Sequence, residues 1–399
     1  MSYDLKDEPV AFSSAHGDLV YVVFDTVKAN SPSFPNFKYV ADVYIGGTMV
    51  SRLKAFPDPV NNFGVFNIGN IVRNYVDSQL TNPNFGSMES DILENYFATV
   101  QVKFGNEYGA TPVLTTNLLL SSAENFYSYY TGRLIGTAEE NLSIYHGNFA
   151  TTRPLRTSII SNATINLMPL FPNDSNGELL VSIYTASGTL IDSGSIGIDI
   201  ITPLAINQLN VSPSILADAP SFNFTNAAYY TVQYVPDDPP AEYVSRVYRF
   251  DLDCEPRYEV YTLHFLNRLG GYETYSFSKR SKRSIDIQRK NYTKLKYTID
   301  SNGLVSYSSD GTVMNDDSVT YYGNFKEKLE LNCDWLTEEQ LAWLSELVKS
   351  PQVYIQSNGY FVPFTITDQS FEFKQRAGDR NFNLKISGEY GDVKNVQYR

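Results

Sequence analysis

The chain has few of the residues that build metal sites and disulfide frameworks. Its 399 residues include only two cysteines, three histidines and two tryptophans. His16, His146 and His264 lie far apart, and Cys254 and Cys333 are isolated, so no metal-ligand spacing is present. We therefore expect no zinc site, no iron–sulfur cluster and no bound cofactor. So few cysteines in a long chain also favour folding in a reducing cytoplasm.

Long apolar runs are missing as well. The longest uninterrupted run, Leu19–Phe24, has six residues, whereas a helix needs about 20 to cross a bilayer. Residues 1–9 include Asp4, Lys6, Asp7 and Glu8 and lack the apolar centre of a secretory signal. The sequence therefore predicts a chain that does not insert into a membrane.

The charge of the chain is acidic but unevenly distributed. Thirty-one basic and 44 acidic residues give a net charge of −13, which argues against direct DNA binding by the whole molecule. The segment 268–296, however, contains nine basic residues and only two acidic residues, Glu273 and Asp286, so its local charge is +7. The basic residues of this segment are Arg268, Lys279, Arg280, Lys282, Arg283, Arg289, Lys290, Lys294 and Lys296.

Two interpretations of this basic segment stay open. It can be a docking surface for an acidic partner, including another copy of this acidic protein, or for nucleic acid passing nearby. It can equally be a long hairpin whose exposed face happens to be basic. We weigh docking of a protein partner and the simple hairpin equally, and we place DNA binding below both.

The aromatic content predicts the fold class. Thirty tyrosines and 24 phenylalanines bring aromatic residues to 14%, a bias typical of β-strands and large contact surfaces. We expect a mainly β protein of two or three sandwich-like or barrel-like domains with a few packed helices. The expected divisions are a β domain with an inserted helix over 1–150, a sandwich-like region over 151–235 and a β domain with one capped helix over 241–399.

Turn signals locate several hairpins in these domains. Gly46–Gly47 separates Lys38–Ile45 from Thr48–Phe56, and Asn267–Gly271 separates Tyr258–Leu266 from Tyr272–Ser278. The prolines of 235–240 predict an extended linker. Other runs expected to form strands are Leu19–Phe24, Tyr96–Phe104, Leu114–Leu120, Thr157–Leu167, Leu179–Tyr184, Thr189–Asp192, Val353–Ile355, Phe361–Ile366, Phe371–Phe373 and Phe382–Ile386.

Two segments have the spacing of amphipathic helices. In residues 66–80, apolar residues recur three and four positions apart from Ile68 to Leu80. In residues 337–349, Thr337 and Gln340 form the pattern of a capping box, and Pro351 ends the helix.

No established catalytic motif is present, and we expect no enzyme. Asp251, Asp253 and Glu255 alternate, so a strand would place them on one face, where they could do acid–base work on a glycoside or hold calcium. A solvated strand face explains them as well, and we favour it. His264 lies in an alternating strand, where a lone histidine is usually a hydrogen-bonded structural residue.

Three stretches carry a resemblance to known proteins. The first is Phe34–Tyr44 (FPNFKYVADVY), continuing through Arg52–Pro57 to Gly64–Gly69. The second is Cys254–Tyr272 (CEPRYEVYTLHFLNRLGGY), and the third runs from Trp335 (WLTEEQLAWL) to Ile355. Together, and in this order, they resemble tail-associated structural proteins, of the tail hub or ring type, of crAss-like and related bacteriophages that infect Bacteroides.

This resemblance implies a structural role and supplies no active-site residues. A member of such a family would be a virion component of the tail, assembled in the host bacterial cytoplasm into a homo-oligomeric ring that contacts other tail proteins. The alternative is a glycan-binding or glycan-cleaving tail spike, in which exposed tyrosines and phenylalanines stack on sugars. Because most aromatic residues alternate along strands, we favour cores and interfaces over sugar platforms.

Overall fold

The structure is a computed structural model in which strands dominate. It describes residues 3–29, 31–78, 80, 91–92, 96–110, 113–114, 126–131, 148–168, 177–198, 207–218, 222–236, 244–253, 256–308, 310–333, 335–357, 359–368, 384–391 and 394–395. These residues form several β-sheets and few helices, which confirms the mainly β fold. The expected strand at 371–373, most of that at 114–120, and linker residues 237–240 lie outside the described residues.

The chain divides into two compact units. Unit 1 comprises residues 1–255 and 265–274, and unit 2 comprises residues 256–264 and 275–399. The turn of one hairpin thus belongs to unit 1, although the sequence on both sides of it belongs to unit 2. The finer division of the first 235 residues at residue 150 stays a prediction.

The N-terminal part of unit 1 contains two sheets, in which most neighbouring strands run antiparallel. One has the order β1-β3-β6, and the other has the order β2-β10-β8-β4-β5 with β9 paired to β8. Their strands are β1 (Tyr3–Asp7), β2 (Phe12–Ser14), β3 (Val20–Asp25), β4 (Lys38–Ile45), β5 (Thr48–Ala55), β6 (Gly64–Asn67), β8 (Phe97–Tyr108), β9 (Val113–Leu114) and β10 (Phe126–Tyr129). Gly46 and Gly47, at φ +56° and +79°, make the expected turn between β4 and β5. Alternating side chains of these strands, including Tyr21, Tyr39 and Phe104, form one core.

Unit 1 also contains a five-stranded sheet and a small three-stranded sheet. The larger sheet has the order β11-β17-β16-β13-β14 and the smaller the order β12-β15-β7. Their elements are β7 (Asp91–Ile92), β11 (Arg156–Ile160), β12 (Asn166–Leu167), β13 (Gly177–Tyr184), β14 (Leu190–Ile198), β15 (Asn207–Asn210), α2 (Pro213–Asp218), β16 (Tyr229–Pro236) and β17 (Tyr248–Asp253). Alternate residues of β13 are buried, as a sheet with one covered face requires.

The helix predicted over 66–80 is much shorter than expected. Residues 64–67 form β6, paired with β3, and only α1 (Gly69–Val72) and the 3₁₀ turn η1 (Arg73–Tyr75) are helical. The Asn67 side-chain oxygen accepts from the Gly69 N–H at 3.0 Å, an Asx-type turn between the strand and the helix. Buried Ile68, Val72 and Val76 keep a spacing of four, but the backbone is extended at Val76. Periodicity located the buried face correctly and overestimated the helix.

Unit 2 contains one helix and most of the strands of an eight-stranded sheet. The sheet order is β19-β18-β24-β25-β26-β23-β20, with β27 paired to β23. Its elements are β18 (Tyr261–Leu266), β19 (Tyr272–Phe277), β20 (Lys282–Thr293), β23 (Ser318–Asn332), α3 (Glu338–Lys349), β24 (Val353–Ser357), β25 (Tyr360–Ile366), β26 (Lys385–Tyr390) and β27 (Lys394–Asn395). At α3 the capping box is confirmed, because the Gln340 N–H donates to Thr337 and the Thr337 N–H donates to the Gln340 side chain.

The turn between β18 and β19 is buried in unit 1. Asn267 makes the turn expected from the sequence, since its side-chain oxygen accepts from the Leu269 and Gly271 N–H groups, each at 2.9 Å. The Tyr96 hydroxyl donates to the Leu269 carbonyl at 2.5 Å. Gly270 has φ +82°, and a Cβ there would lie 2.0 Å from the Tyr130 carbonyl oxygen. Only glycine fits this position.

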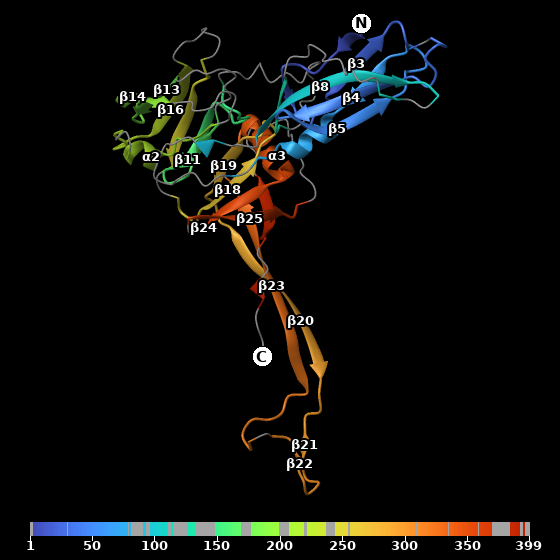
Figure 1. The fold of residues 1–399 in the computed structure, drawn as a ribbon. Helices are drawn as coiled ribbons and strands as arrows, with labels where there is room; N and C mark the ends of the chain where they lie inside the picture. The colour runs from blue at the N-terminus through green and yellow to red at the C-terminus, as the bar shows by residue number, and fades with distance from the viewer. Residues whose placement is uncertain are drawn as a thin grey trace, which may run out of the picture. The chain divides into compact units, whose positions relative to one another are not determined.

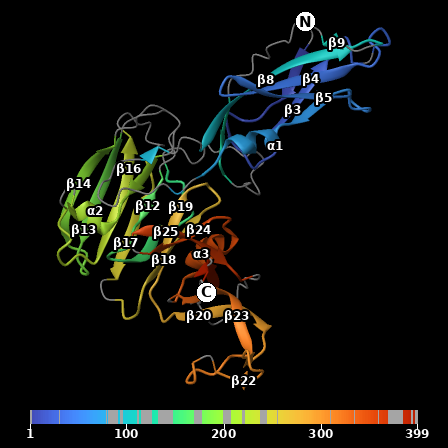
Figure 2. The same cartoon turned by 60° about the horizontal axis from the view of Figure 1, so that its bottom comes forward.

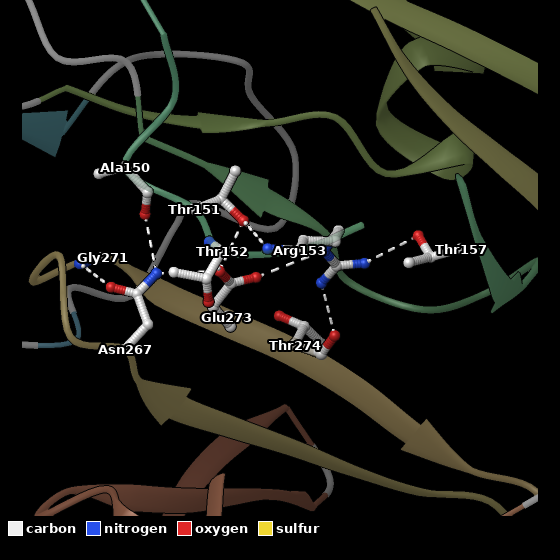
Figure 3. A network of polar contacts seen from close by, with 9 residues as sticks. All are labelled: Ala150, Thr151, Thr152, Arg153, Thr157, Asn267, Gly271, Glu273 and Thr274. Atoms are coloured by element: carbon white, nitrogen blue, oxygen red, sulfur yellow. Dashed lines mark hydrogen bonds and ion pairs between the residues drawn. The ribbon is translucent and has the colours of Figure 1, made fainter. Parts of the chain in front are cut away.

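A buried carboxylate anchors the same turn (Figure 3). Glu273 accepts from the Thr151 hydroxyl at 2.6 Å, the Thr152 N–H at 3.0 Å and the Asn267 amide at 2.9 Å. Its other oxygen lies 3.4 Å from Arg153 Nε, and Arg153 also donates to the Thr274 carbonyl at 2.6 Å. Burial lowers the pKa of Arg153, and the charge of Glu273 opposes that shift. The pair is structural, because each charged group is enclosed by hydrogen-bonding partners.

Replacing Glu273 by leucine leaves the Arg153 guanidinium buried without its counter-charge. We expect the free energy of unfolding to fall by about 3–5 kcal/mol, measured by urea denaturation at neutral pH. Glu178→Leu is the matched control, since Glu178 is exposed on β13 and its loss should cost less than about 0.5 kcal/mol. Equal effects of the two substitutions would contradict the anchoring role of Glu273.

Candidate docking surface

Unit 2 carries a long two-stranded ribbon. Strands β20 and β23 pair antiparallel from Lys282–Glu330 to Thr293–Ser318. The ribbon leads away from the other strands of unit 2 and ends in the small hairpin of β21 (Thr298–Ile299) and β22 (Val305–Ser306) (Figures 1 and 2). We call residues 279–332 the arm and residues 294–317 its tip.

Most apolar side chains of the arm are exposed, although Leu329 and Leu331 of β23 are buried. All twelve residues of β20 are exposed, and no described residue of the tip is buried. The large apolar residues exposed along the arm are Ile285, Ile287, Tyr292, Leu295, Ile299, Leu304, Val305, Tyr307, Val313, Met314, Tyr321 and Tyr322. Such a density of exposed apolar groups is typical of interaction surfaces.

Local hydrogen bonds shape the tip in the absence of a core. The Asp300 carboxylate accepts from the Asn302 and Leu304 N–H groups at 2.9 and 2.8 Å. The Asp310 carboxylate accepts in the same way from Thr312 and Val313, and these bonds lower the pKa of Asp310 to about 2. Aspartate turns of this kind fix a loop without tertiary packing. The tip is therefore ordered by its own sequence.

The two faces of the ribbon differ in chemistry. Residues that face each other across antiparallel strands point to the same side, so Ile285 and Ile287 share a face with Phe325, which lies opposite Ile287. The exposed fractions of Ile285 and Ile287 are 56% and 55%. The opposite face carries the even-numbered, mostly polar residues of β20. We call the first of these the isoleucine face.

The predicted basic residues divide between the two units. Eight of the nine lie on the arm: four within β20, two before it and two after it. Arg268 instead lies in the buried-turn segment that belongs to unit 1. Of the two acidic residues of the segment, Glu273 is buried in unit 1 and Asp286 lies on β20. The docking role of these residues stays a prediction, and Arg268 is separated from the arm by this division.

Carboxylates on the ribbon are already paired, whereas several cations are not. Asp286 pairs with Lys328, and Glu327 lies 3.2 Å from Arg283, raising the pKa of both basic groups. Glu330 pairs with Lys385 at 2.8 Å. Five further cations of the arm have no ion-pair partner within the described residues. These are Lys282, Arg289, Lys290, Lys294 and Lys296.

The alternating carboxylates of β17 are not arranged as an acid–base pair. Asp251 lies 2.5 Å from Arg156 Nε and 2.7 Å from Arg249 Nη2, so both of its oxygens are engaged. Asp253 is exposed at the end of the strand, and Glu255 lies outside the described residues. Asp251 is thus an ion-pairing strand residue. In the part of the chain that the structure describes, no group of three or more His, Cys, Asp or Glu residues could hold a metal ion.

His264 is a buried structural residue. Its Nε2 lies 3.3 Å from the Gln356 side-chain oxygen, and its ring meets Phe361 edge to face at 4.7 Å. Burial lowers the pKa of His264 to about 4, against an ordinary value of 6.5. The imidazole is therefore neutral at physiological pH. His16 bonds the Thr131 carbonyl, while His146 and Cys254 lie outside the described residues.

His264 gives unit 2 a pH-dependent stability of known sign. Its pKa is lower in the folded chain, so the unfolded chain takes up a proton first as the pH falls through 6.5. We expect the free energy of unfolding to fall by about 2 kcal/mol between about pH 7 and pH 5. Urea titrations should show this slope, and His264→Phe should lack it. An equal slope in both proteins would exclude His264 as its source.

Sequence reasoning missed half of the arm. Strand β23 contains Gly323 and alternating charges from Lys326 to Glu330, a composition that does not stand out as a strand. The pairing of the basic segment with β23 could not be predicted from the sequence either, because partners such as Lys282 and Glu330 are distant in sequence. The sequence signal that could have revealed the arm lies in the tip, where apolar residues stand between polar turn sequences.

Comparison with known proteins assigns the chain to no family. No family model and no curated protein matches the chain. The matching solved structures include the calcium-binding domain CBD12 of CALX1.1, which is 8% identical and covers 63% of this chain and 100% of its own, with a TM-score of 0.19. A score this low carries no argument about fold or function. Among the described residues, no helix has the length and apolar character to span a membrane.

Proposed function

We propose that the chain is a non-enzymatic structural component of a bacteriophage tail: a hub, ring or fibre-attachment protein. In this role it forms a homo-oligomeric ring, docks neighbouring virion proteins and resides in the virion after assembly in the host bacterial cytoplasm. The resemblance of the three sequence stretches supports the tail. The observation that carries an assembly role is the series of exposed apolar side chains along β20 and the tip of the arm.

Charge separation within the chain favours association between copies. The arm holds ten basic and seven acidic residues, a net charge of +3, while the whole chain carries −13. All residues outside the arm therefore sum to −16. In a ring, one surface of each copy meets a different surface of the next, and a cationic arm against an acidic neighbour suits such a contact.

The alternative, a glycan-binding or glycan-cleaving tail spike, gains no specific support. Its candidate acid, Asp251, is held by two arginines. Its candidate aromatic platform would need exposed rings gathered on one face. Large aromatics such as Tyr21, Tyr230 and Phe250 fill the cores. The tyrosines exposed on the arm, which are Tyr292, Tyr307, Tyr321 and Tyr322, suit a protein interface as well as a sugar.

Shortening the arm tests this function. Ser284 and Lys328 face each other across the ribbon, so an Asn-Gly turn can replace residues 285–327 and close the hairpin. We expect this variant to fold but to lose oligomers in sedimentation experiments. We also expect it to be missing from purified phage particles by mass spectrometry.

A full-length variant guards against misfolding of the shortened chain. Leu304→Asp places a charge on a tip residue that is 67% exposed, and Val60→Asp makes the same change at an 89% exposed position in unit 1. Leu304→Asp should lower incorporation into particles by about tenfold or more, whereas Val60→Asp should not. Normal incorporation of both arm variants, or the absence of the wild-type chain from particles, would contradict the proposal.

A further inference from the structure

We propose that the outer edge of β20 receives an acidic, extended strand from a partner protein, which joins the sheet by β-strand addition. This inference rests on the proposed function, because it specifies how the arm docks. It names the kind of segment that binds: an extended strand that carries apolar residues beside Ile285 and Ile287 and, on the same face, a carboxylate beside Arg289. The argument uses the backbone edge, the isoleucine face and the charge of β20.

The backbone edge of β20 is available along its whole length. In antiparallel sheets, alternate residues direct their N–H and C=O groups to one neighbour and the others direct theirs to the opposite side. β20 ends the sheet order, with β23 as its neighbour, and no second strand pairs with it in the described part of the chain. Twelve residues span about 40 Å, enough to template a long added strand.

The isoleucine face supplies apolar contacts for such a strand. Ile285 and Ile287 are more than half exposed, and Phe325 lies beside Ile287. A strand added at the edge would place alternate side chains next to these isoleucines, about 5 Å away. Apolar residues at those positions would lose water together with Ile285 and Ile287.

The cations of β20 favour an added strand that carries negative charge. Lys282, Arg283, Arg289 and Lys290 outnumber Asp286, which already pairs with Lys328. Arg289 faces Gly323 across the ribbon, a position without a side chain to pair with it. The guanidinium of Arg289 therefore lies on the isoleucine face without an ion-pair partner in the described residues. A carboxylate on an added strand would complete this pair.

The same charges exclude β20 of a second copy as the partner. Two β20 strands side by side would bring eight cations together with two carboxylates, an arrangement that repulsion disfavours. Basic residues on edge strands commonly prevent pairing between like strands. Here they leave the edge open to an acidic strand while rejecting a basic one.

The test uses the full chain and defined peptide probes. A labelled twelve-residue peptide is titrated and followed by fluorescence anisotropy. Its sequence places valines beside Ile285 and Ile287, glutamates beside Lys282, Arg289 and Lys290, and threonine elsewhere. A second peptide has lysine in place of each glutamate. We expect micromolar binding of the acidic peptide alone. A third peptide, with one central valine replaced by proline, keeps the charge but breaks the strand. It should bind at least about tenfold more weakly.

Variants locate the binding on β20. Arg289→Glu and Ile287→Asp should each weaken binding of the acidic peptide by about tenfold or more. Lys296→Glu is the matched control, since it makes the same charge change outside the strand, and its effect should stay below about threefold because salt screens distant charges. Both kinds of variant change exposed residues, so the fold is expected to persist.

Three results would overturn the inference. Equal binding of the proline peptide would indicate charge attraction without strand addition. Equal loss on Lys296→Glu would place the contact elsewhere on the arm. A concentration-dependent dimer that Ile287→Asp abolishes, without peptide binding, would assign the edge to β20 of a second copy. Incorporation of the shortened-arm variant into particles separates these results from failure of the proposed function.

Discussion

A β-hairpin has no interior, and this constraint governs two hairpins of the same sheet in opposite ways. The hairpin of β18 and β19 places its turn among residues of unit 1, where Leu269, Tyr272 and Glu273 are buried. The hairpin of β20 and β23 ends in a tip in which no described residue is buried. The first is stabilised within the chain, by Glu273 and by glycines that fit against neighbouring carbonyls. The second leaves apolar side chains exposed, as interaction surfaces do, and for this reason we propose the arm as the place where function lies.

The two hairpins also differ in how they treat charge. Glu273 and Arg153 are enclosed and satisfied by hydrogen bonds, so that their burial is tolerable. On the arm, the carboxylates of the ribbon are neutralised by nearby lysines and arginines, while Arg289 and several lysines have no ion-pair partner among the residues that the structure describes. An excess of exposed cations within an otherwise acidic chain has little value for stability. It has direct value for choosing a partner and orienting the encounter.

Features encoded locally could be predicted from the sequence, and features encoded by distant pairing could not. The Gly46–Gly47 turn and the Thr337–Gln340 capping box depend on neighbouring residues, and both were located correctly. The helix at 66–80 was overextended because a strand followed by one helical turn buries Phe66, Ile68 and Val72 with similar spacing. The basic segment was visible as composition. Its exposure, its pairing with β23 and the separate burial of Glu273 depend on contacts across tens to more than a hundred residues.

Amide hydrogen exchange of β20, compared between the free chain and purified phage particles, tests the central claim most directly. If the arm docks by strand addition, outward-facing N–H groups of residues 282–293 gain hydrogen bonds in the particle. Their exchange should then slow by about tenfold or more, while the β4–β5 turn at Gly46–Gly47 should keep its rate. Equal exchange rates for β20 in the free chain and in the particle would contradict the account.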